Sequence, residues 1–317
     1  MDAGHVPVMA GRVTDLLTPA LARDGAVLVD ATIGRAGHAR ALLDACPGMV
    51  LIGIDADLAA IEAARDILAP YAARITLVHA RFDEIAAIVL GHGHERINGV
   101  LFDLGVSSPQ LDDAERGFAY AREAPLDMRM NLEGARTAAN IVNEYPAADL
   151  ARVLRDYGEE RFARRIADRI VAERQREPIT STLRLSEIVK DSIPAATRRT
   201  GGNPAKRTFQ ALRIEVNDEL GTLRRALPAA LDMLAAGGRI AVLAYHSLED
   251  RIVKQELASR TSDPTPPGLP VQLHKPQFRL LTRGAERPGE AELGSNPRAA
   301  SARLRVAERI SMTRGGD

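Results

Sequence analysis

The chain is poor in aromatic residues, has no tryptophan and has one cysteine. Aromatics make up 3% of its 317 residues, so any core must be built from Ala, Leu, Ile and Val. The single Cys46 excludes a disulfide framework and a structural zinc site of several thiolates. No apolar stretch approaches the ~20 residues that span a bilayer, and no secretory signal pattern opens the chain. These absences predict a soluble, cytoplasmic protein with an aliphatic core.

Neither sign of charge is in excess. Lys+Arg and Asp+Glu both number 42, and the formal net charge is +0. The chain therefore lacks a global field that would attract nucleic acid, and any site for a polyanion must come from a local arrangement. His92 and His94 flank a glycine without the companion ligands that a metal site needs, so no metal is predicted.

Residues 26–38 form the local pattern that says most about a ligand site. A short apolar run leads into Asp30, Gly34 and Gly37 follow, and a helical pattern begins at Ala39. This order predicts a buried strand, a tight turn and a helix N-terminus. Glycine allows a ligand to approach the backbone closely, and the helix end adds N–H donors and partial positive charge. Alone, the pattern is equally typical of an ordinary strand-to-helix connection.

Further apolar runs alternate with helical patterns. The expected strands are 26–29, 49–55, 75–78, 99–102, 239–245 and 304–310, and helices are expected at 58–68 and 84–90. This alternation predicts an α/β fold with a doubly wound, mainly parallel sheet and right-handed crossovers.

The middle of the chain follows another pattern. Residues 111–204 lack strand-like runs and contain amphipathic helical patterns at 147–154, 159–175 and 185–192. We therefore expect residues 1–110 and 205–317 to form the sheet domain, and 111–204 to be an inserted all-helical subdomain for substrate recognition. A long helical pattern at 208–236, interrupted near Gly221, leads back into the sheet.

Polar and aromatic residues stand where the expected strands end. In an open parallel sheet, ligands bind beyond the carboxyl ends of the strands. Asp55 follows the glycine turn by about 20 residues, a spacing that suits a carboxylate accepting hydrogen bonds from ribose hydroxyls. Its alternative role is the N-cap of the helix that starts near Leu58. Phe82 either stacks on an adenine ring or belongs to the core.

Two kinds of adenosine-containing cofactor suit such an edge. A dinucleotide requires G-x-G-x-x-G, and the turn here reads Gly-Arg-Ala-Gly-His. S-adenosylmethionine has no phosphate, and its sulfonium charge favours acids such as Asp30, Asp55 and Asp103. The residues therefore favour a methyltransferase over an oxidoreductase, and the strand-end acids argue against a non-catalytic scaffold.

Seven segments carry a resemblance to a known family. They are Asp30–His38, Leu101–Phe118, Pro125–Met130, Tyr157–Phe162, Arg207–Arg213, His246–Lys254 and Asn296–Arg305. They span nearly the whole chain in the family's order. On these segments the chain resembles the ribosomal RNA small-subunit methyltransferase H family, also called MraW.

The resemblance implies a Rossmann-like class I S-adenosylmethionine-dependent methyltransferase sheet with the inserted helical subdomain. It implies methyl transfer from S-adenosylmethionine to N4 of a decoding-centre cytidine of 16S rRNA, with the small ribosomal subunit as partner. The alternative is an amino-methyltransferase that acts on another RNA or on a DNA base.

The resemblance also implies which residues contact the cofactor. With Gly34 of the turn, the expected set is Gly34, Ala36, Gly37, His38, Asp55, Phe82, Asp103 and Gln110. Two residues depart from the family's pattern. Ala36 replaces a glycine, and backbone N–H contacts survive this change if its φ is negative. Asn131 replaces the acid that usually follows Met-Arg-Met, which puts in doubt any role that needs a charge there.

The chemistry suggests further candidates. The N4 amino group of cytosine is a poor nucleophile, so the enzyme must position it in line with the methyl group, and an acceptor for its N–H protons helps. We expect Asp103 at the boundary of cofactor and target, and Ser107 or Ser108 near the base. His246 and Ser247 are expected in the target pocket, or alternatively in a structural turn and helix cap. The base must be splayed out of its strand.

A local basic run is a candidate contact with rRNA phosphates. It consists of Arg198, Arg199, Lys206, Arg207 and Arg213, with no acid before Glu215. The alternative is a solvated helix face.

Overall fold

A computed structural model describes residues 7–107, 110–111, 113–195, 203–262 and 276–310. The chain divides into two compact units. The sheet unit comprises Met1–Gly105 and Gly221–Asp317, and the helical unit comprises Val106–Leu220. Among the described residues, no helix is both long and apolar enough to cross a membrane.

The sheet unit is built on seven strands in the order β3-β2-β1-β4-β5-β7-β6. The first five are parallel, whereas β7 runs antiparallel to both β5 and β6. The strands are β1 (Val27–Asp30), β2 (Val50–Asp55), β3 (Ile75–His79), β4 (Ile97–Asp103), β5 (Leu234–Ala244), β6 (Phe278–Leu280) and β7 (Arg303–Arg309). The predicted α/β sheet is confirmed.

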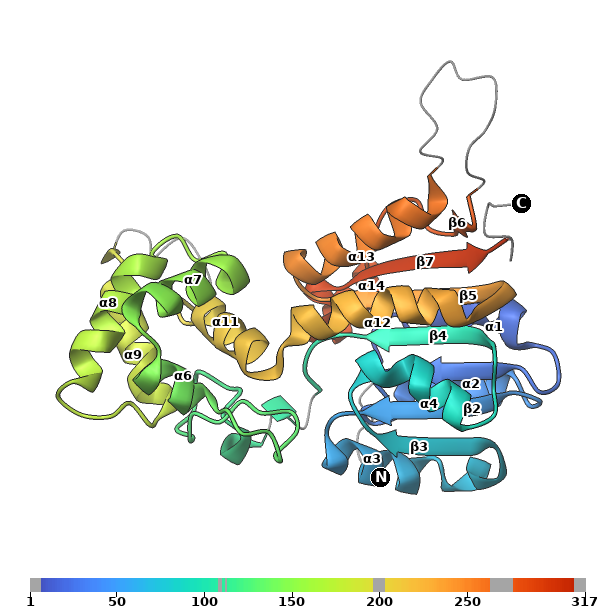
Figure 1. Ribbon diagram of the computed structural model, residues 1–317, viewed down its shortest axis with the longest axis horizontal. Coiled ribbons are helices and arrows are strands. Elements are labelled where there is room, and N and C mark those ends of the chain that lie inside the picture. Colours follow the sequence, from blue (N-terminus) through green and yellow to red (C-terminus); the bar gives the residue numbers. More distant parts are fainter. Residues whose placement is uncertain (1–6, 108–109, 112, 196–202, 263–275, 311–317) are drawn as a thin grey trace, which may run out of the picture. The chain divides into compact units, whose positions relative to one another are not determined.

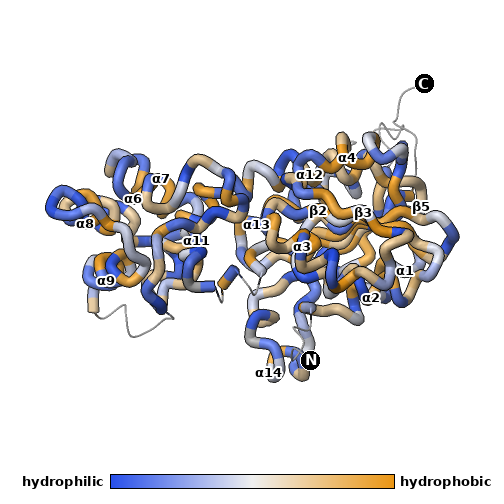
Figure 2. The backbone as a smooth tube through the Cα atoms, turned by 90° about the horizontal axis from the view of Figure 1, so that it is seen from below, coloured by the Kyte–Doolittle hydropathy of each residue, from blue (hydrophilic) through white to orange (hydrophobic). Residues whose placement is uncertain are grey.

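Helices cover both faces of this sheet (Figure 1). One face packs against α1 (Ala10–Leu21), α2 (Gly37–Ala45) and α3 (Leu58–Ile67), which share an aliphatic core with strand residues such as Leu28 and Leu101. In front of the strands in Figure 1 lie α4 (Ile85–Gly91), α12 (Glu219–Met233) and α13 (Ser247–Thr261). Strands β2, β3 and β5 are mostly hydrophobic in Figure 2. Most of β2 is buried, whereas β3 lies at the edge of the sheet and is half-buried.

Short elements complete the sheet unit. They are the 3₁₀ turns η1 (Ala69–Arg74), η2 (Phe82–Glu84) and η4 (Pro297–Ser301), and the helix α14 (Glu290–Ser295).

The described part of the helical unit contains helices and 3₁₀ turns. Its elements are η3 (Ala114–Arg116), α6 (Ala138–Glu144), α7 (Ala147–Gly158), α8 (Ala163–Arg174), α9 (Thr182–Ser192) and α11 (Lys206–Asn217). They enclose a separate core that includes Leu150, Ile166 and Leu185. The amphipathic patterns at 147–154, 159–175 and 185–192 correspond to α7, α8 and α9.

The helical unit ends later than the expected boundary at residue 204. Helix α11 belongs to it, because Phe209 and Leu212 are buried in the helical core. The long helical pattern at 208–236 is therefore two helices, separated at Asp218, whose φ is 49°. Helix α11 belongs to the helical unit and most of α12 to the sheet unit. The break between the two helices therefore lies close to the boundary between the units.

Gly158 permits the close packing of α7 on α11, which provides a test. A Cβ atom at residue 158 would lie 2.7 Å from the Arg207 carbonyl oxygen. Because a backbone carbonyl cannot swing away, we expect Gly158→Ala to destabilise the protein by about 1–3 kcal/mol. Thermal and urea denaturation measure this loss.

Gly11→Ala is the matched control, because Gly11 lies in α1 with no atom within 4 Å of its added Cβ. It should be neutral or stabilising by up to about 1 kcal/mol. Equal effects of the two substitutions would contradict the packing argument.

Candidate active site

Three aspartates end neighbouring parallel strands at one edge of the sheet. Asp30 ends β1, Asp55 ends β2 and Asp103 ends β4. β1 pairs with both β2 and β4, so these carboxylates belong to adjacent strand ends. Tyr245 directly follows β5, which is the next strand. The carboxyl ends of the strands, where the sequence predicted a ligand site, thus bring together acids from separate parts of the chain.

Asp55 connects the glycine turn to the end of β2. Its Oδ2 atom accepts a hydrogen bond of 2.9 Å from the Gly34 N–H, and its Oδ1 atom accepts one of 2.9 Å from the Asp57 N–H. Burial raises the pKa of Asp55 to about 6. The alternative role of Asp55 as N-cap is wrong, because Asp57 caps α3 by accepting from Ala59 N–H at 3.1 Å.

The turn itself adopts left-handed backbone conformations. Gly34 has φ 49° and Ala36 has φ 55°. The condition of a negative φ at Ala36 is therefore not met, and an alanine holds a conformation that favours glycine. The Ala36 N–H donates to the Ile33 carbonyl at 2.7 Å, which closes the turn. Gly37 then starts α2, and a Cβ there would lie 2.4 Å from Pro7 Cγ.

Asp103 is held by groups from three other elements. Its N–H donates to Thr32 Oγ1 at 2.7 Å, and its Oδ1 accepts from the Tyr245 hydroxyl at 2.7 Å. Its Oδ2 lies 3.6 Å from Nε2 of His38 in α2. The structure therefore brings together His38 and Asp103, each of which was predicted to contact the cofactor.

Asp30 is the most buried of the three acids, with 2% of its surface exposed. Burial raises its pKa to about 8, against a hydrogen bond from Thr32 N–H that lowers it, and the charges of Asp103 and Asp55 raise it further. The Asp30 side chain is therefore mainly neutral at pH 7, unlike the ionised acid expected for sulfonium attraction.

Phe82 opens η2 after β3. Its ring meets the buried Phe102 edge to face, with 5.6 Å between centroids and 85° between planes. Asp83, next to it, pairs with Arg225 of α12 at 2.8 Å. Phe82 is thus a half-buried ring with a fixed neighbour, and both predicted roles, core packing and a stacking surface, are compatible with this position.

His246 caps helix α13. Its Nδ1 accepts from the Glu249 N–H at 3.4 Å, and its Nε2 lies 3.2 Å from Glu249 Oε1. Glu249 in turn accepts from the Tyr245 N–H at 2.8 Å. This is the structural turn and cap considered from sequence. Ser247 is the first residue of α13.

Ser107 and Gln110, predicted near the target base and at the cofactor, lie at the start of the helical unit. Gln110 is buried, and its Oε1 accepts from the Ser107 N–H at 3.0 Å. Ser108 lies outside the described residues. The roles of Ser107, Ser108 and Gln110 stay predictions.

The basic run is divided by its contacts. Arg213 is held by Glu219 through two hydrogen bonds, of 2.8 and 3.0 Å, with 14% of its side chain exposed. Arg207 is exposed and donates to the Glu159 carbonyl at 3.0 Å, and Lys206 is exposed at the start of α11. Arg198 and Arg199 lie outside the described residues. Arg213 is thus engaged inside the protein, which weighs against a phosphate contact there.

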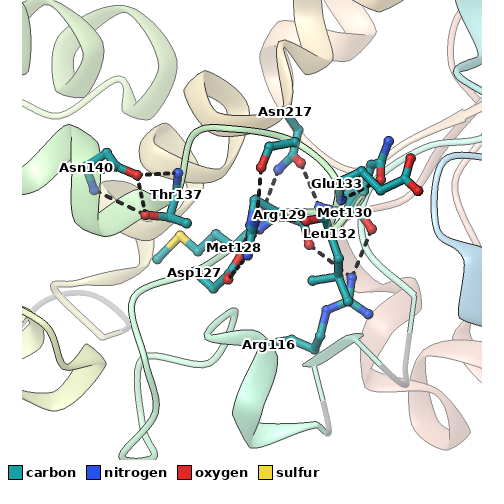
Figure 3. A network of polar contacts seen from close by, with 12 residues as sticks. Arg116, Asp127, Met128, Arg129, Met130, Leu132, Glu133, Thr137, Asn140 and Asn217 are labelled. Carbon is teal, nitrogen blue, oxygen red and sulfur yellow. Dashed lines mark hydrogen bonds and ion pairs between the residues drawn. The ribbon is translucent and has the colours of Figure 1, made fainter.

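A polar network orders the loop around Pro125–Met130 (Figure 3). Asp127 accepts two hydrogen bonds from the Arg129 guanidinium at 2.8 and 2.7 Å. Burial opposes ionisation of Asp127, but these bonds prevail and lower its pKa. Asn217 of α11 accepts from Met130 N–H and donates to the Met128 carbonyl, both at 2.8 Å.

Asn131 has a local role in the same loop. Its Oδ1 accepts from the Glu133 N–H at 2.9 Å (Figure 3 labels Glu133). Aspartate and asparagine both supply this acceptor. The departure from the family's acid therefore leaves this turn intact.

Tyr245, Thr32 and Asn217 were not identified from sequence. Each forms one or two hydrogen bonds with a residue at least 70 positions away in the chain. In the sequence, the only indication of a role for Tyr245 is that it directly precedes the His246–Lys254 segment of the family resemblance. Among the described residues, no group of three or more His, Cys, Asp or Glu side chains is arranged to hold a metal ion.

The sheet order, the glycine turn and the strand-end acids define the class of Rossmann-like, S-adenosylmethionine-dependent class I methyltransferases. The chain belongs to the MraW methylase family, whose model matches residues 2–310. The predicted family is therefore confirmed.

Similar proteins cover nearly the whole chain. A protein of Thermobifida fusca named ribosomal RNA small subunit methyltransferase H is 62% identical over 96% of this chain and 93% of its own length. The protein of that name from Frankia alni is 59% identical over 97% of this chain and 95% of its own. A solved putative rRNA-methylase of Clostridium thermocellum has 13% identity and a TM-score of 0.45, covering 98% of this chain and 100% of that one.

The buried Asp30 makes stability depend on pH. Its folded pKa of about 8 lies above the ordinary value of 3.8, so its favourable contribution is full at low pH and is lost as pH rises through 8. Asp30→Asn keeps an acceptor for Thr32 N–H and does not titrate. We expect the wild type to lose stability relative to Asp30→Asn between about pH 4 and pH 8, with no further relative loss above that, as measured by urea denaturation. Parallel pH dependences would refute this assignment.

Proposed function

We propose that this chain transfers a methyl group from S-adenosylmethionine to N4 of a decoding-centre cytidine of 16S rRNA in the small ribosomal subunit. The observation that carries the proposal is the 62% identity, over 96% of the chain, to a protein named ribosomal RNA small subunit methyltransferase H. The choice of N4 and of the decoding centre rests on the family resemblance and on the chemistry of the strand ends.

The residues at the strand ends fit the cofactor. Asp55 is immobilised by two backbone N–H groups, and each carboxylate oxygen retains a lone pair for ribose hydroxyls. The first turn of α2, beginning at Gly37, presents N–H groups that suit the methionine carboxylate. The half-buried ring of Phe82 offers a face for the adenine.

Positioning is the main catalytic requirement. The bound cofactor supplies a methyl group on a positively charged sulfur. As N4 gains the methyl group it must lose one proton, so an acceptor beside its N–H bonds favours the reaction. The Asp103 carboxylate, oriented by Tyr245 and by its own backbone bond to Thr32, is the acceptor that we assign to this role.

The rRNA requires cationic contacts outside this edge. We assign phosphate contacts to Lys206 and Arg207, which are exposed at the start of α11, together with Arg198 and Arg199. Arg213 is omitted because Glu219 already neutralises it.

Cofactor binding tests the role of Asp55. Asp55→Asn removes the charge and one of the two acceptors that bind Gly34 N–H and Asp57 N–H. We expect the Kd for S-adenosylmethionine to rise at least tenfold, because hydrogen bonds to charged groups are worth about 1.5–3 kcal/mol. Wild-type affinity should also weaken below about pH 6, where Asp55 becomes protonated, and the variant should lack this dependence. Isothermal titration calorimetry measures both effects.

The control for this experiment is Asp57→Asn, two residues away. Asparagine caps a helix as well as aspartate does, so α3 and cofactor affinity should be unaffected. Equal affinities of wild type and Asp55→Asn would remove Asp55 from the cofactor site.

The product identifies the target atom. The purified protein, incubated with small ribosomal subunits from cells that lack it and with labelled cofactor, should yield N4-methylcytidine in 16S rRNA by nucleoside mass spectrometry. Asp103→Ala should reduce incorporation at least a hundredfold, since it removes the acceptor. Methylation of another atom, of another RNA or of DNA would instead favour the alternative amino-methyltransferase.

A further inference from the structure

Two side chains that approach the Asp103 carboxylate differ in origin, because His38 belongs to the predicted site and Tyr245 does not. His38 Nε2 lies 3.6 Å from Oδ2, and the Tyr245 hydroxyl donates to Oδ1 at 2.7 Å. Tyr245 comes from the connection between β5 and α13, 142 residues further along the chain. Asp103 is thus hydrogen-bonded by a residue from the end of the adjacent strand, β5.

The ring of Tyr245 is fixed independently of its hydroxyl group. Its backbone N–H donates to the Glu249 carboxylate at 2.8 Å, and Glu249 is 2% exposed. The ring lies over the glycine that follows β4, because a Cβ at Gly105 would meet Tyr245 Cδ2 at 3.4 Å. Removal of the hydroxyl should therefore leave the ring in place.

The surroundings make Tyr245 a donor. Burial and the Asp103 charge raise the pKa of Tyr245, so the hydroxyl keeps its proton across the physiological range. The other ionisable groups nearby are Asp30 on β1, His38 on α2, Glu249 on α13 and Glu292 on α14. Asp30 is mainly neutral at pH 7, and the negative charges of Glu249 and Glu292 would favour protonation of Asp103. The hydrogen bond from the neutral Tyr245 hydroxyl opposes protonation of Asp103 without adding a charge to the site.

We propose that Tyr245 is a positioning residue for methyl transfer, whose hydroxyl keeps the Asp103 carboxylate ionised and in one orientation. The carboxylate held in this way acts toward the cofactor or the amino group of the target base. This inference rests on the methyl transfer proposed above. Tyr245 itself exchanges no proton with the substrate.

Tyr245→Phe tests this role through the pH dependence of the rate. Without the donor, Asp103 is protonated more easily, so the acidic limb of the kcat–pH profile should move up by about one pH unit. On the acidic limb, kcat at a given pH should fall about tenfold, with a much smaller loss on the plateau at higher pH and little change in the KM for S-adenosylmethionine. A purely structural tyrosine would lower the rate equally at all pH values, which would overturn the proposal.

Tyr71→Phe is the matched control. Tyr71 also donates to an aspartate, Asp44, in the sheet unit, but at an exposed position away from the strand ends. Its removal should leave the profile unchanged. In an Asp103→Asn background, Tyr245→Phe should cause no further shift of the profile, because the titrating partner is absent. An additional shift there would contradict the proposed coupling.

A second variant covers the case in which Tyr245→Phe does not fold. Site-specific 3-fluorotyrosine at 245 keeps the ring and is a stronger donor, so the acidic limb should move to lower pH. An unchanged limb would overturn the proposal. If the wild type does not methylate small subunits, the proposed function fails, and the pH dependence of cofactor affinity in wild type and Tyr245→Phe then tests Tyr245 separately.

Discussion

The Gly34 N–H group donates a hydrogen bond of 2.9 Å to the Asp55 carboxylate, and this contact joins the turn after β1 to the end of β2. The same carboxylate accepts from Asp57 N–H, so one buried acid shapes two consecutive connections. The left-handed conformations of Gly34 and Ala36 follow from this closed turn, and they set where α2 begins. Together with the bond from Ile33 N–H to the Ile54 carbonyl, at 2.9 Å, the contact holds the turn from which α2 and His38 follow.

The three strand-end aspartates differ because their environments differ. Asp30 is almost fully buried with one backbone donor, and its pKa of about 8 makes it a mainly neutral structural group at pH 7. Asp55 has two backbone donors and a pKa of about 6, so it is ionised at neutral pH. Asp103 is partly exposed and receives a hydroxyl donor from another strand end. One residue type thus supplies a structural group, a cofactor ligand and an acceptor in our proposal, and burial separates these roles.

Some arginines of the helical unit bind groups within the protein rather than facing solvent. Arg129 binds Asp127 and the carbonyls of Leu132 and Gly134, which holds a loop without regular secondary structure in one conformation. Arg213 forms an ion pair with Glu219. A count of basic residues along the chain therefore overstates the cations available to rRNA phosphates. The planar guanidinium group suits both uses, and only its partners distinguish them.

The sequence by itself determined six of the strands, most of the helices, the edge at which Asp55 and Asp103 lie, and the family, but not the short β6 and α14. Apolar runs and helical periodicity record whether each residue is buried, and this is a local property of the chain. Tertiary structure alone decided that α11 belongs to the helical unit, that Asp57 rather than Asp55 caps α3, and that Ala36 is left-handed. It also paired Tyr245 with Asp103 and Arg213 with Glu219. These features depend on which groups meet when strand ends and helices pack, and a periodic pattern carries no record of the partner.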